Sequence, residues 1–200
     1  MPTIAVVTFD GFNELDSLIA FAVLNRVRRP GWRAVLACPT PTVTSMNEVV
    51  MSAQAPLEVV ADADAVILGS GIKTRDLVAD PALMARLTLD PTRQLVGAQC
   101  SGALIAARLG LLRGVPACTD LVTRPWLADA GVEVVDLPFH AHGNVATAGG
   151  CLASLYLAAW TIARLAGGEA AHAAIHYVAP VGEKDDTVAR VMGAIARYLT

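Results

Sequence analysis

The sequence predicts an α/β domain in which a mostly parallel central sheet is sandwiched by helices. Short apolar runs of strand length alternate with segments of helical periodicity over roughly the first half of the chain. Runs without polar alternation are typical of parallel strands that are covered on both faces. No repeat, low-complexity tract or linker divides the 200 residues. We therefore expect one domain over residues 1–200, with its active site beyond the carboxyl ends of the strands.

Four strands are expected in this first half, and each is followed by turn residues and then a helical pattern. The first helix is indicated by apolar residues that recur three to four positions apart between Leu15 and Val27. Residues 40–55 fit the alternation poorly, so we interpret them as a short hairpin or a loop. The four expected strands are residues 3–9, 33–38, 65–68 and 95–98.

The second half of the chain predicts one more strand and two prominent helices. The strand is expected over residues 144–148. A helix over residues 150–166 is apolar nearly all round and ends at a Gly-Gly pair, which is a common helix-termination signal. Such a helix belongs between the sheet and a partner. Apolar residues between Val188 and Leu199 predict an amphipathic helix at the end of the chain.

Hydrophobic residues make up 54% of the chain, which raises the question of a membrane segment. The longest apolar run, residues 151–166, already contains Ser154, Thr161 and Arg164. It is also shorter than the roughly 20 apolar residues that a membrane-spanning helix needs. The N-terminus has no basic region and no cleavage site of the kind found in export signals. We therefore expect a cytoplasmic protein with a tightly buried core.

Charge and cysteine spacing exclude further classes of function. The net charge is -3, and the 15 Lys and Arg residues are scattered apart from Arg26, Arg28 and Arg29, so no basic face for nucleic acid is predicted. A small neutral molecule is the expected ligand. The four cysteines form no C-x-x-C pair and have no histidine at metal-ligand spacing. We expect free thiols, no metal and no cofactor.

Cys100 lies at the tip of a turn between a buried strand and an apolar helix, like a thiol version of a nucleophile elbow. A sulfur at a helix N-terminus faces free amides and the positive end of the helix dipole, which commonly lowers a cysteine pKa to roughly 3.5 to 7.5. The Ser101 amide would then face a developing oxyanion. The alternative is a core cysteine, because cysteine is often fully buried.

Two other turns carry candidate residues. Ser70 and Gly71 follow the third strand, where backbone amides would supply a second oxyanion donor; alternatively, the glycines of this turn only permit its conformation. Asp16 follows Asn13 by three residues, as in a capping box. The other interpretation makes Asp16 a buried acid beside the thiol, with a raised pKa, that donates a hydrogen bond and a proton. Spacing alone does not choose between them.

None of the four histidines has the context of a catalytic base. His140 and His142 precede the strand at residues 144–148, and His172 and His176 are four apart on an Ala-rich helix. The second pair lacks the glutamate of a zinc motif. We interpret all four as structural side chains.

Together, the three turns resemble those of the ThiJ/PfpI superfamily, which has a flavodoxin-like, class I glutamine-amidotransferase-like fold. The resemblance covers nearly the whole chain. The last matching segment, which leads into the long helix, looks like the isonitrile hydratase branch. The segments that carry the resemblance are residues 9–16, 66–71, 98–102, 110–119 and 143–150.

The resemblance implies that Cys100 is the nucleophile and that Asp16 is the acid hydrogen-bonded to it. It also implies an oxyanion or substrate-binding role for Gly71, Ser101 and Ser70, although Ser70 interrupts the Gly-Gly pair that the family has in this turn.

Two positions separate the branches of the family. Ser101 stands where the hydratase branch has a hydroxyl residue and the protease-like branch has histidine, which disfavours a peptidase. Asp120 stands where glyoxalase and deglycase members carry a histidine, so a Cys-His dyad from that position is absent.

The expected function is therefore a cysteine-dependent enzyme that acts on a small molecule, of the type that hydrates an isonitrile to an N-substituted formamide. The alternatives are an oxidative-stress sensor based on Cys100, a small-ligand-binding protein of the same fold, and a glyoxalase- or deglycase-like enzyme. The family also implies a homodimer, but the sequence does not indicate which surface forms it.

Overall fold

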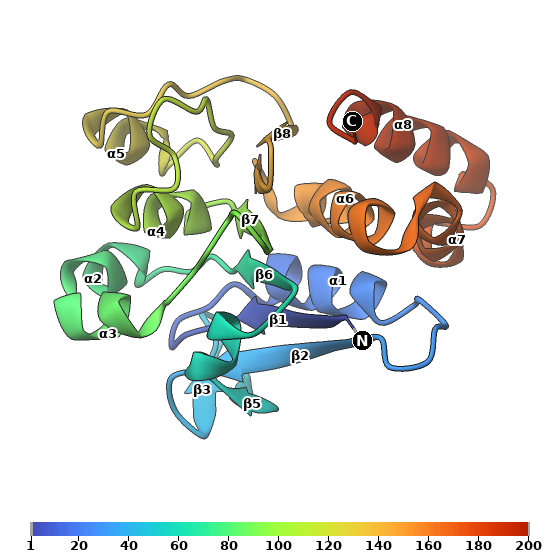
Figure 1. Cartoon of the computed structure of the whole chain (residues 1–200). Helices are drawn as coiled ribbons and strands as arrows, with labels where there is room; N and C mark the ends of the chain where they lie inside the picture. The colour runs from blue at the N-terminus through green and yellow to red at the C-terminus, as the bar shows by residue number, and fades with distance from the viewer. Residues whose placement is uncertain (1, 200) are drawn as a thin grey trace.

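The computed structural model describes residues 2–199, and it has the predicted central sheet with helices on both faces (Figure 1). The first and last residues of the expected domain, residues 1 and 200, lie outside this range. The sheet is built from seven strands: β1 (Thr3–Val7), β2 (Arg33–Cys38), β5 (Ala55–Pro56), β6 (Ala65–Leu68), β7 (Leu95–Gln99), β8 (Phe139–His142) and β9 (Val145–Ala148).

The strands lie in the order β5-β2-β1-β6-β7-β9-β8, and every pair is parallel except β8 with β9. The mostly parallel sheet predicted from the apolar runs is therefore confirmed. Three expected strands differ at one end, because β1 stops at Val7, β7 continues to Gln99 and β9 begins at Val145. The antiparallel edge strand β8 is not predicted by the sequence, since its alternating His140 and His142 give it no continuous apolar run.

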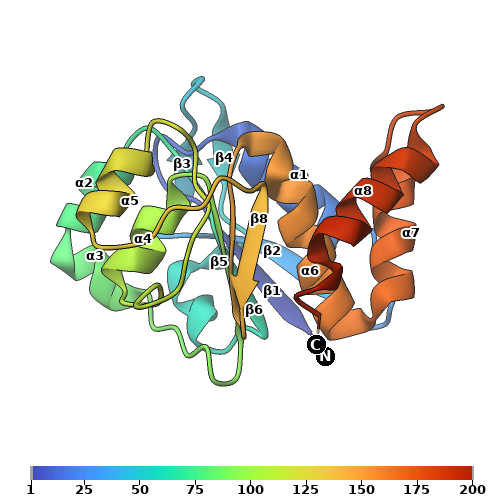
Figure 2. The same ribbon diagram turned by 90° about the horizontal axis from the view of Figure 1, so that it is seen from above.

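One face of the sheet is covered by α1 (Glu14–Leu24), α6 (Ser154–Ala166), α7 (Gly168–Val178) and α8 (Lys184–Ala196). The opposite face is covered by α2 (Thr74–Ala79), α3 (Pro81–Arg86), α4 (Gly102–Arg108), α5 (Arg124–Asp129) and the 3-10 turn η1 (Leu57–Ala61). Seen from above, the two groups of helices flank the sheet on opposite sides (Figure 2).

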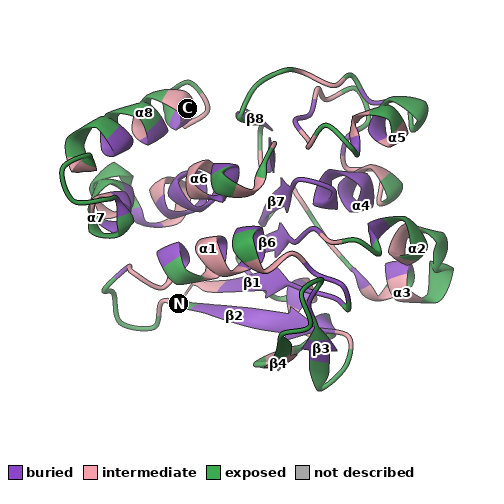
Figure 3. Ribbon diagram, turned by 180° about the vertical axis from the view of Figure 1, so that it is seen from behind, coloured by how far each residue is buried: buried purple, intermediate pink, exposed green. Residues whose placement is uncertain are grey.

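Strand alternation sorts the core into two apolar clusters. On β1, Ile4 and Val6 belong to the first cluster, under α1, α6, α7 and α8, whereas Ala5 and Val7 belong to the second, under η1, α4 and α5. The inner strands are buried except at Thr3 and Arg33, the first residues of β1 and β2, and the exposed residues of the helices lie on their outer faces (Figure 3). Two-sided burial explains why these strands carry no polar alternation.

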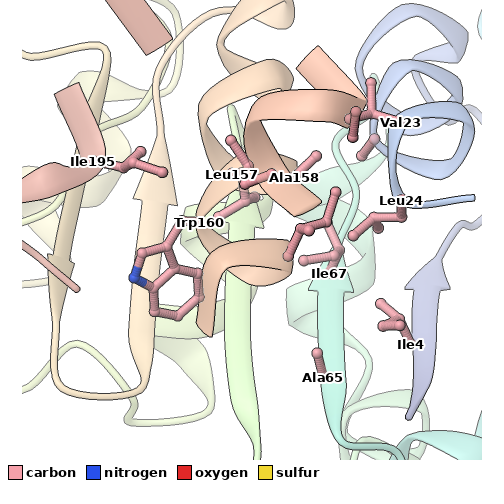
Figure 4. Packing of buried hydrophobic residues seen from close by; sticks show 14 of the residues in the cluster. Ile4, Val23, Leu24, Ala65, Ile67, Leu157, Ala158, Trp160 and Ile195 are labelled. Atoms are coloured by element: carbon pink, nitrogen blue, oxygen red, sulfur yellow. The ribbon is translucent and has the colours of Figure 1, made fainter. Parts of the chain in front are cut away.

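The long apolar helix lies inside the first cluster. It begins as a 3-10 turn, η2 (Cys151–Ala153), and becomes α-helical from Ser154. Its Leu157 and Trp160 are fully buried, and α1, α7 and α8 pack around it (Figure 4). Gly167 ends the helix with a φ of 93°, as the Gly-Gly signal predicts. The partner that covers α6 is thus other helices of the same chain.

Residues 40–55 form the hairpin that was one of their two interpretations, with β3 (Thr42–Thr44) antiparallel to β4 (Val50–Ser52). This hairpin is anchored to the turn after β1, since the Gly11 amide donates to the Thr44 carbonyl at 2.7 Å and the Met46 amide donates to the Phe12 carbonyl at 2.8 Å. The hairpin is thus a separate two-stranded sheet that lies beside the turn after β1. None of the helices between residues 2 and 199 is long and apolar enough to cross a bilayer.

Candidate active site

The three predicted turns meet at one edge of the sheet. Since β6 pairs in parallel with both β1 and β7, the carboxyl ends of these strands lie side by side. Asp16 follows β1, Ser70 follows β6 and Cys100 follows β7. The expectation that chemistry gathers beyond the carboxyl ends of the strands therefore agrees with this arrangement.

Cys100 occupies a sharp strand-to-helix turn. Its φ is 44°, in the left-handed region that disfavours residues with a side chain. Both of its backbone groups are held, because its amide donates to the Ala148 carbonyl and its carbonyl accepts from the Thr119 hydroxyl, each at 2.8 Å. A Cβ on Gly102, two residues after Cys100, would lie 2.5 Å from the Leu68 carbonyl oxygen. The elbow is thus pressed against the end of β6 and fixed in position.

Asp16 is fully buried and is held by hydroxyl groups. The Ser70 hydroxyl donates to Oδ2 of Asp16, and the Ser17 hydroxyl donates to Oδ1 at 3.3 Å. The capping role belongs to Asn13, whose side chain accepts from the Leu15 amide at 3.0 Å. The capping interpretation of Asp16 is therefore wrong, because its carboxylate points into the protein and not back to the helix end.

The Asp16 carboxylate and the Cys100 sulfur are neighbours. A carboxylate oxygen of Asp16 and the sulfurs of Cys100 and Cys151 all lie within 4.8 Å of one another. Burial raises the pKa of Asp16, although hydrogen bonds from Ser70, Cys100 and Ser17 lower it in part. Burial beside the thiol and a raised pKa thus agree with the second interpretation of Asp16, and proton donation by Asp16 stays a prediction.

The lowered pKa expected for the Cys100 thiol is wrong. Burial raises the pKa of this thiol strongly, and the negative charge of the Asp16 carboxylate raises it further. The helix dipole acts locally, whereas desolvation comes from the whole surrounding fold. The contribution of Asp16 vanishes when its carboxyl group is protonated, so the two side chains compete for protons and act as a pair.

The two predicted oxyanion donors, the amides of Gly71 and Ser101, differ in whether they already have a hydrogen-bond acceptor. The Gly71 amide donates to Oγ of Ser101 at 3.2 Å, and that hydroxyl also shares a hydrogen bond with the Thr74 hydroxyl at 2.8 Å. Gly71 is thus not a free donor in this geometry, contrary to expectation, because the Ser101 side chain already occupies its N–H. The backbone amide of Ser101 has no acceptor within the described part of the chain, so it is an open donor at the elbow, as is that of Gly102.

A cavity of about 430 Å³ opens over Cys100. Ile72 and Met46 contribute apolar surface, and the Arg75 guanidinium lies 4.8 Å from the centre of the Trp126 ring. Among the described residues, no histidine lines this cavity. The side chains that line it are those of Asn13, Met46, Ser70, Ile72, Thr74, Arg75, Cys100, Ser101, Asp120, Val122, Thr123, Trp126 and Cys151.

Asp120 has a structural role at the position where other branches carry histidine. Its carboxylate accepts from the amides of Val122 and Thr123, each at 2.9 Å, and so fixes the turn that leads into α5. His140, by contrast, lies on the edge strand β8 and packs against Tyr198. Among the described residues, Cys100 therefore has the buried Asp16 carboxyl group beside it, and the cavity wall supplies no imidazole.

Cys151 is a site residue that the sequence did not predict. It follows β9, the strand beside β7, and the Asn13 side-chain amide donates to its sulfur at 3.2 Å. The Gly-Gly pair before Cys151 was the available signal, since a glycine turn after a parallel strand leads to the same edge as the elbow. With Asp16 and Cys100, Cys151 forms a cluster of ligand atoms close enough to hold a thiophilic metal ion.

Fold and site together define an α/β protein with a cysteine at a nucleophile elbow and a buried carboxyl group beside it. The DJ-1/PfpI family matches residues 2–163, and the chain belongs to that family. No curated protein sequence matches the chain.

Solved structures of low sequence identity share the fold. A ThiJ/PfpI family protein from Pseudomonas syringae has a TM-score of 0.78 at 19% identity, with 99% of this chain and 89% of that chain covered. Schizosaccharomyces pombe DJ-1 has a TM-score of 0.76 at 17% identity, with 89% and 99% covered. A two-domain protein from Anabaena variabilis, with DJ-1/ThiJ/PfpI-like and ferritin-like domains, has a TM-score of 0.74 at 16% identity. The match covers 87% of this chain and 55% of that longer one.

Proposed function

We propose that the protein is a Cys100-dependent enzyme that hydrates a small neutral isonitrile to an N-substituted formamide. The observation that carries the proposal is the Asp16 carboxyl group buried beside the Cys100 thiol, which itself lines a cavity without a described histidine. An isonitrile accepts the nucleophile and the proton at the same carbon atom and has no leaving group to protonate. One thiol with one adjacent acid therefore suffices for its activation.

The proposed first step joins the Cys100 sulfur to the terminal carbon of the isonitrile. The thiol proton passes through the Asp16 carboxyl group to the same carbon, which gives a thioimidate. Water then adds to that carbon, and the C–S bond breaks as the Cys100 thiol is regenerated and the formamide leaves. The open Ser101 amide would stabilise the oxygen that develops during water addition.

The cavity supports a small and uncharged substrate. Its lining combines the apolar side chains of Met46, Ile72 and Val122 with the Trp126 ring, and Cys100 lines the same cavity. A glyoxalase- or deglycase-like reaction is less well supported, because the carboxylate of Asp120 is held by backbone amides at the position of the expected histidine.

The test is turnover of a panel of alkyl and aryl isonitriles, with formamide measured by chromatography. In the Cys100→Ala variant we expect kcat/KM to fall by about 10³-fold or more, and in Asp16→Asn by roughly 10² to 10⁴. Cys38→Ala is the matched control, since Cys38 is buried beside Thr8 and does not line the cavity. Formamide production that survives in Cys100→Ala, or no turnover of any isonitrile by the folded protein, would refute the proposal.

A further inference from the structure

We propose that Cys151 is the resolving thiol for Cys100, so that oxidation of Cys100 by a hydroperoxide ends in an intrachain Cys100–Cys151 disulfide. The inference rests on the nucleophilic Cys100 of the proposed function but requires no isonitrile chemistry. It assigns a reversible modification site to the same cavity, with hydroperoxides as the class of oxidant.

The distance between the two thiols is the first support. Their sulfurs lie within 4.8 Å of each other, and a disulfide bond brings two sulfurs to about 2.05 Å. Both residues line the cavity, so a hydroperoxide that reaches one sulfur also reaches the other. Cys100 is buried and Cys151 is half-buried.

The topology of the sheet produces this proximity. Strands β7 and β9 are parallel neighbours, with Gln99 in register with Ala148. Cys100 follows the first of these residues directly, and Cys151 follows the second after two glycines. Parallel strands lie about 4.8 Å apart, so two cysteines that follow matched strand ends are brought together.

The two backbones differ in how firmly they are held. Cys100 is fixed by hydrogen bonds from its amide and to its carbonyl. Cys151 is the first residue of η2, which is one turn of 3-10 helix. It directly follows Gly150, whose φ is 91°. The Asn13 amide holds the Cys151 sulfur toward the cavity at 3.2 Å. A side-chain rotation at Cys151, with a small shift of its short turn, is therefore the movement that closes the bond.

The other two cysteines lack this arrangement. Cys38 is buried and shares a hydrogen bond with the Thr8 hydroxyl at 3.1 Å, and Cys118 is buried beside Thr147. Neither lines the cavity over the elbow. Selective pairing of Cys100 with Cys151 is thus what the structure supports among the four thiols.

The chemistry balances with one hydroperoxide. The Cys100 thiol takes the terminal oxygen of the hydroperoxide, which breaks the O–O bond, oxidises the sulfur to sulfenic acid and releases an alcohol, or water from hydrogen peroxide. The Cys151 thiol then attacks this sulfur, forms the S–S bond and releases water. Two thiols are oxidised and one peroxide is reduced, and an external thiol restores both cysteines. Without Cys151, a second peroxide would carry Cys100 to sulfinic acid, which most thiols do not reduce.

The test compares the wild-type protein with Cys151→Ser and the control Cys38→Ser after treatment with hydrogen peroxide, in the absence of any isonitrile. Peptide mass spectrometry without reduction should show a Cys100–Cys151 crosslink in the wild type and in Cys38→Ser. Dithiothreitol should then return both thiols. In Cys151→Ser, the sulfenic acid of Cys100 should instead persist and react with dimedone when dimedone is present. Without dimedone, it should be oxidised further to sulfinic acid, which dithiothreitol does not reduce. Circular dichroism checks the fold, and Cys151→Ala serves as a second variant.

The inference is overturned if wild-type Cys100 reaches sulfinic acid as fast as it does in Cys151→Ser while Cys151 stays free, or if Cys100 does not react with peroxide. These outcomes are separable from those of the hydratase proposal. Cys100-dependent formamide production without a crosslink would remove this inference alone, whereas a crosslink without isonitrile turnover would remove the hydratase alone.

Discussion

Ser70 is the residue that connects the oxyanion turn to the acid, because its hydroxyl donates to Asp16 and lowers the pKa of that carboxyl group. In the proposed reaction the active form of the Asp16–Cys100 pair has lost one proton, so activity rises with pH through the pKa of Asp16. Burial raises that pKa, which places the acidic limb of kcat/KM above the ordinary value of 3.8 for aspartate.

Replacing Ser70 with Ala removes a hydrogen bond that lowers the pKa of Asp16, so the acidic limb should move to higher pH. The measurement is the pH profile of kcat/KM for formamide formation. Thr92→Ala is the control, because it removes a hydroxyl that donates to the exposed Asp90 at 2.6 Å, away from the site. A limb that stays in place in Ser70→Ala, or moves to lower pH, would show that Asp16 does not control the profile.

Single residues also show which parts of the candidate site the sequence predicts. Cys100 and Asp16 are predictable because each follows a strand at a turn, and parallel strand ends lie at one edge. Their protonation is only partly predictable, because it depends on burial by the whole fold and on a hydrogen bond from Ser70, which is distant in the sequence. Cys151 itself is missed, since nothing in the local sequence says that β9 lies beside β7.

At the level of elements, α4 is the helix on which the elbow depends. A Cβ at Gly102, the first residue of α4, would lie 2.5 Å from the Leu68 carbonyl oxygen and 2.8 Å from that of Gly69. Gly102→Ala should therefore push α4 away from the end of β6 and lower the free energy of unfolding by about 1 to 3 kcal/mol. Chemical denaturation measures this change.

The matched control is Gly193→Ala in α8, where an added Cβ meets nothing within 4 Å. The same substitution at this exposed helical position should raise the free energy of unfolding by about 0.5 to 1 kcal/mol, because alanine favours helix over glycine. Equal effects at the two positions would contradict the close approach of α4 to β6.

The predictability of elements follows their length and burial. The inner strands and α6 are long or uniformly apolar, so their patterns are readable. The short helices α2, α3 and α5 each have six residues, which is less than two helical turns, and the edge strand β5 has two residues, so none of them repeats its pattern often enough to be recognised. These elements form because the tertiary structure covers them.

Across the whole molecule, the sheet is shared by two apolar clusters, and the expected single domain requires them to unfold together. Trp160 and Trp32 belong to the first cluster, and Trp126 packs against the second. The Trp126→Phe variant keeps only the two tryptophans of the first cluster, so its fluorescence reports that cluster. The double variant Trp32→Phe/Trp160→Phe keeps only Trp126, so its fluorescence reports the second cluster. In each variant the denaturation midpoint by fluorescence should equal the midpoint by circular dichroism. A Trp126 transition at lower denaturant than the loss of secondary structure would show that the α2–α5 side unfolds separately.

The homodimer implied by the family resemblance stays a prediction at this scale. Sedimentation equilibrium of the purified protein distinguishes a 20.8 kDa monomer from a particle of twice that mass.

The left-handed backbone at Cys100 also bears on the evolution of the chain. A side chain in this conformation costs roughly 1 to 2 kcal/mol that glycine would avoid. Cysteine therefore persists at the elbow only while selection for its thiol outweighs the gain in stability that glycine offers. In a duplicated gene released from that selection, this position should be among the first to drift, and the fold would survive the change while the thiol chemistry would not.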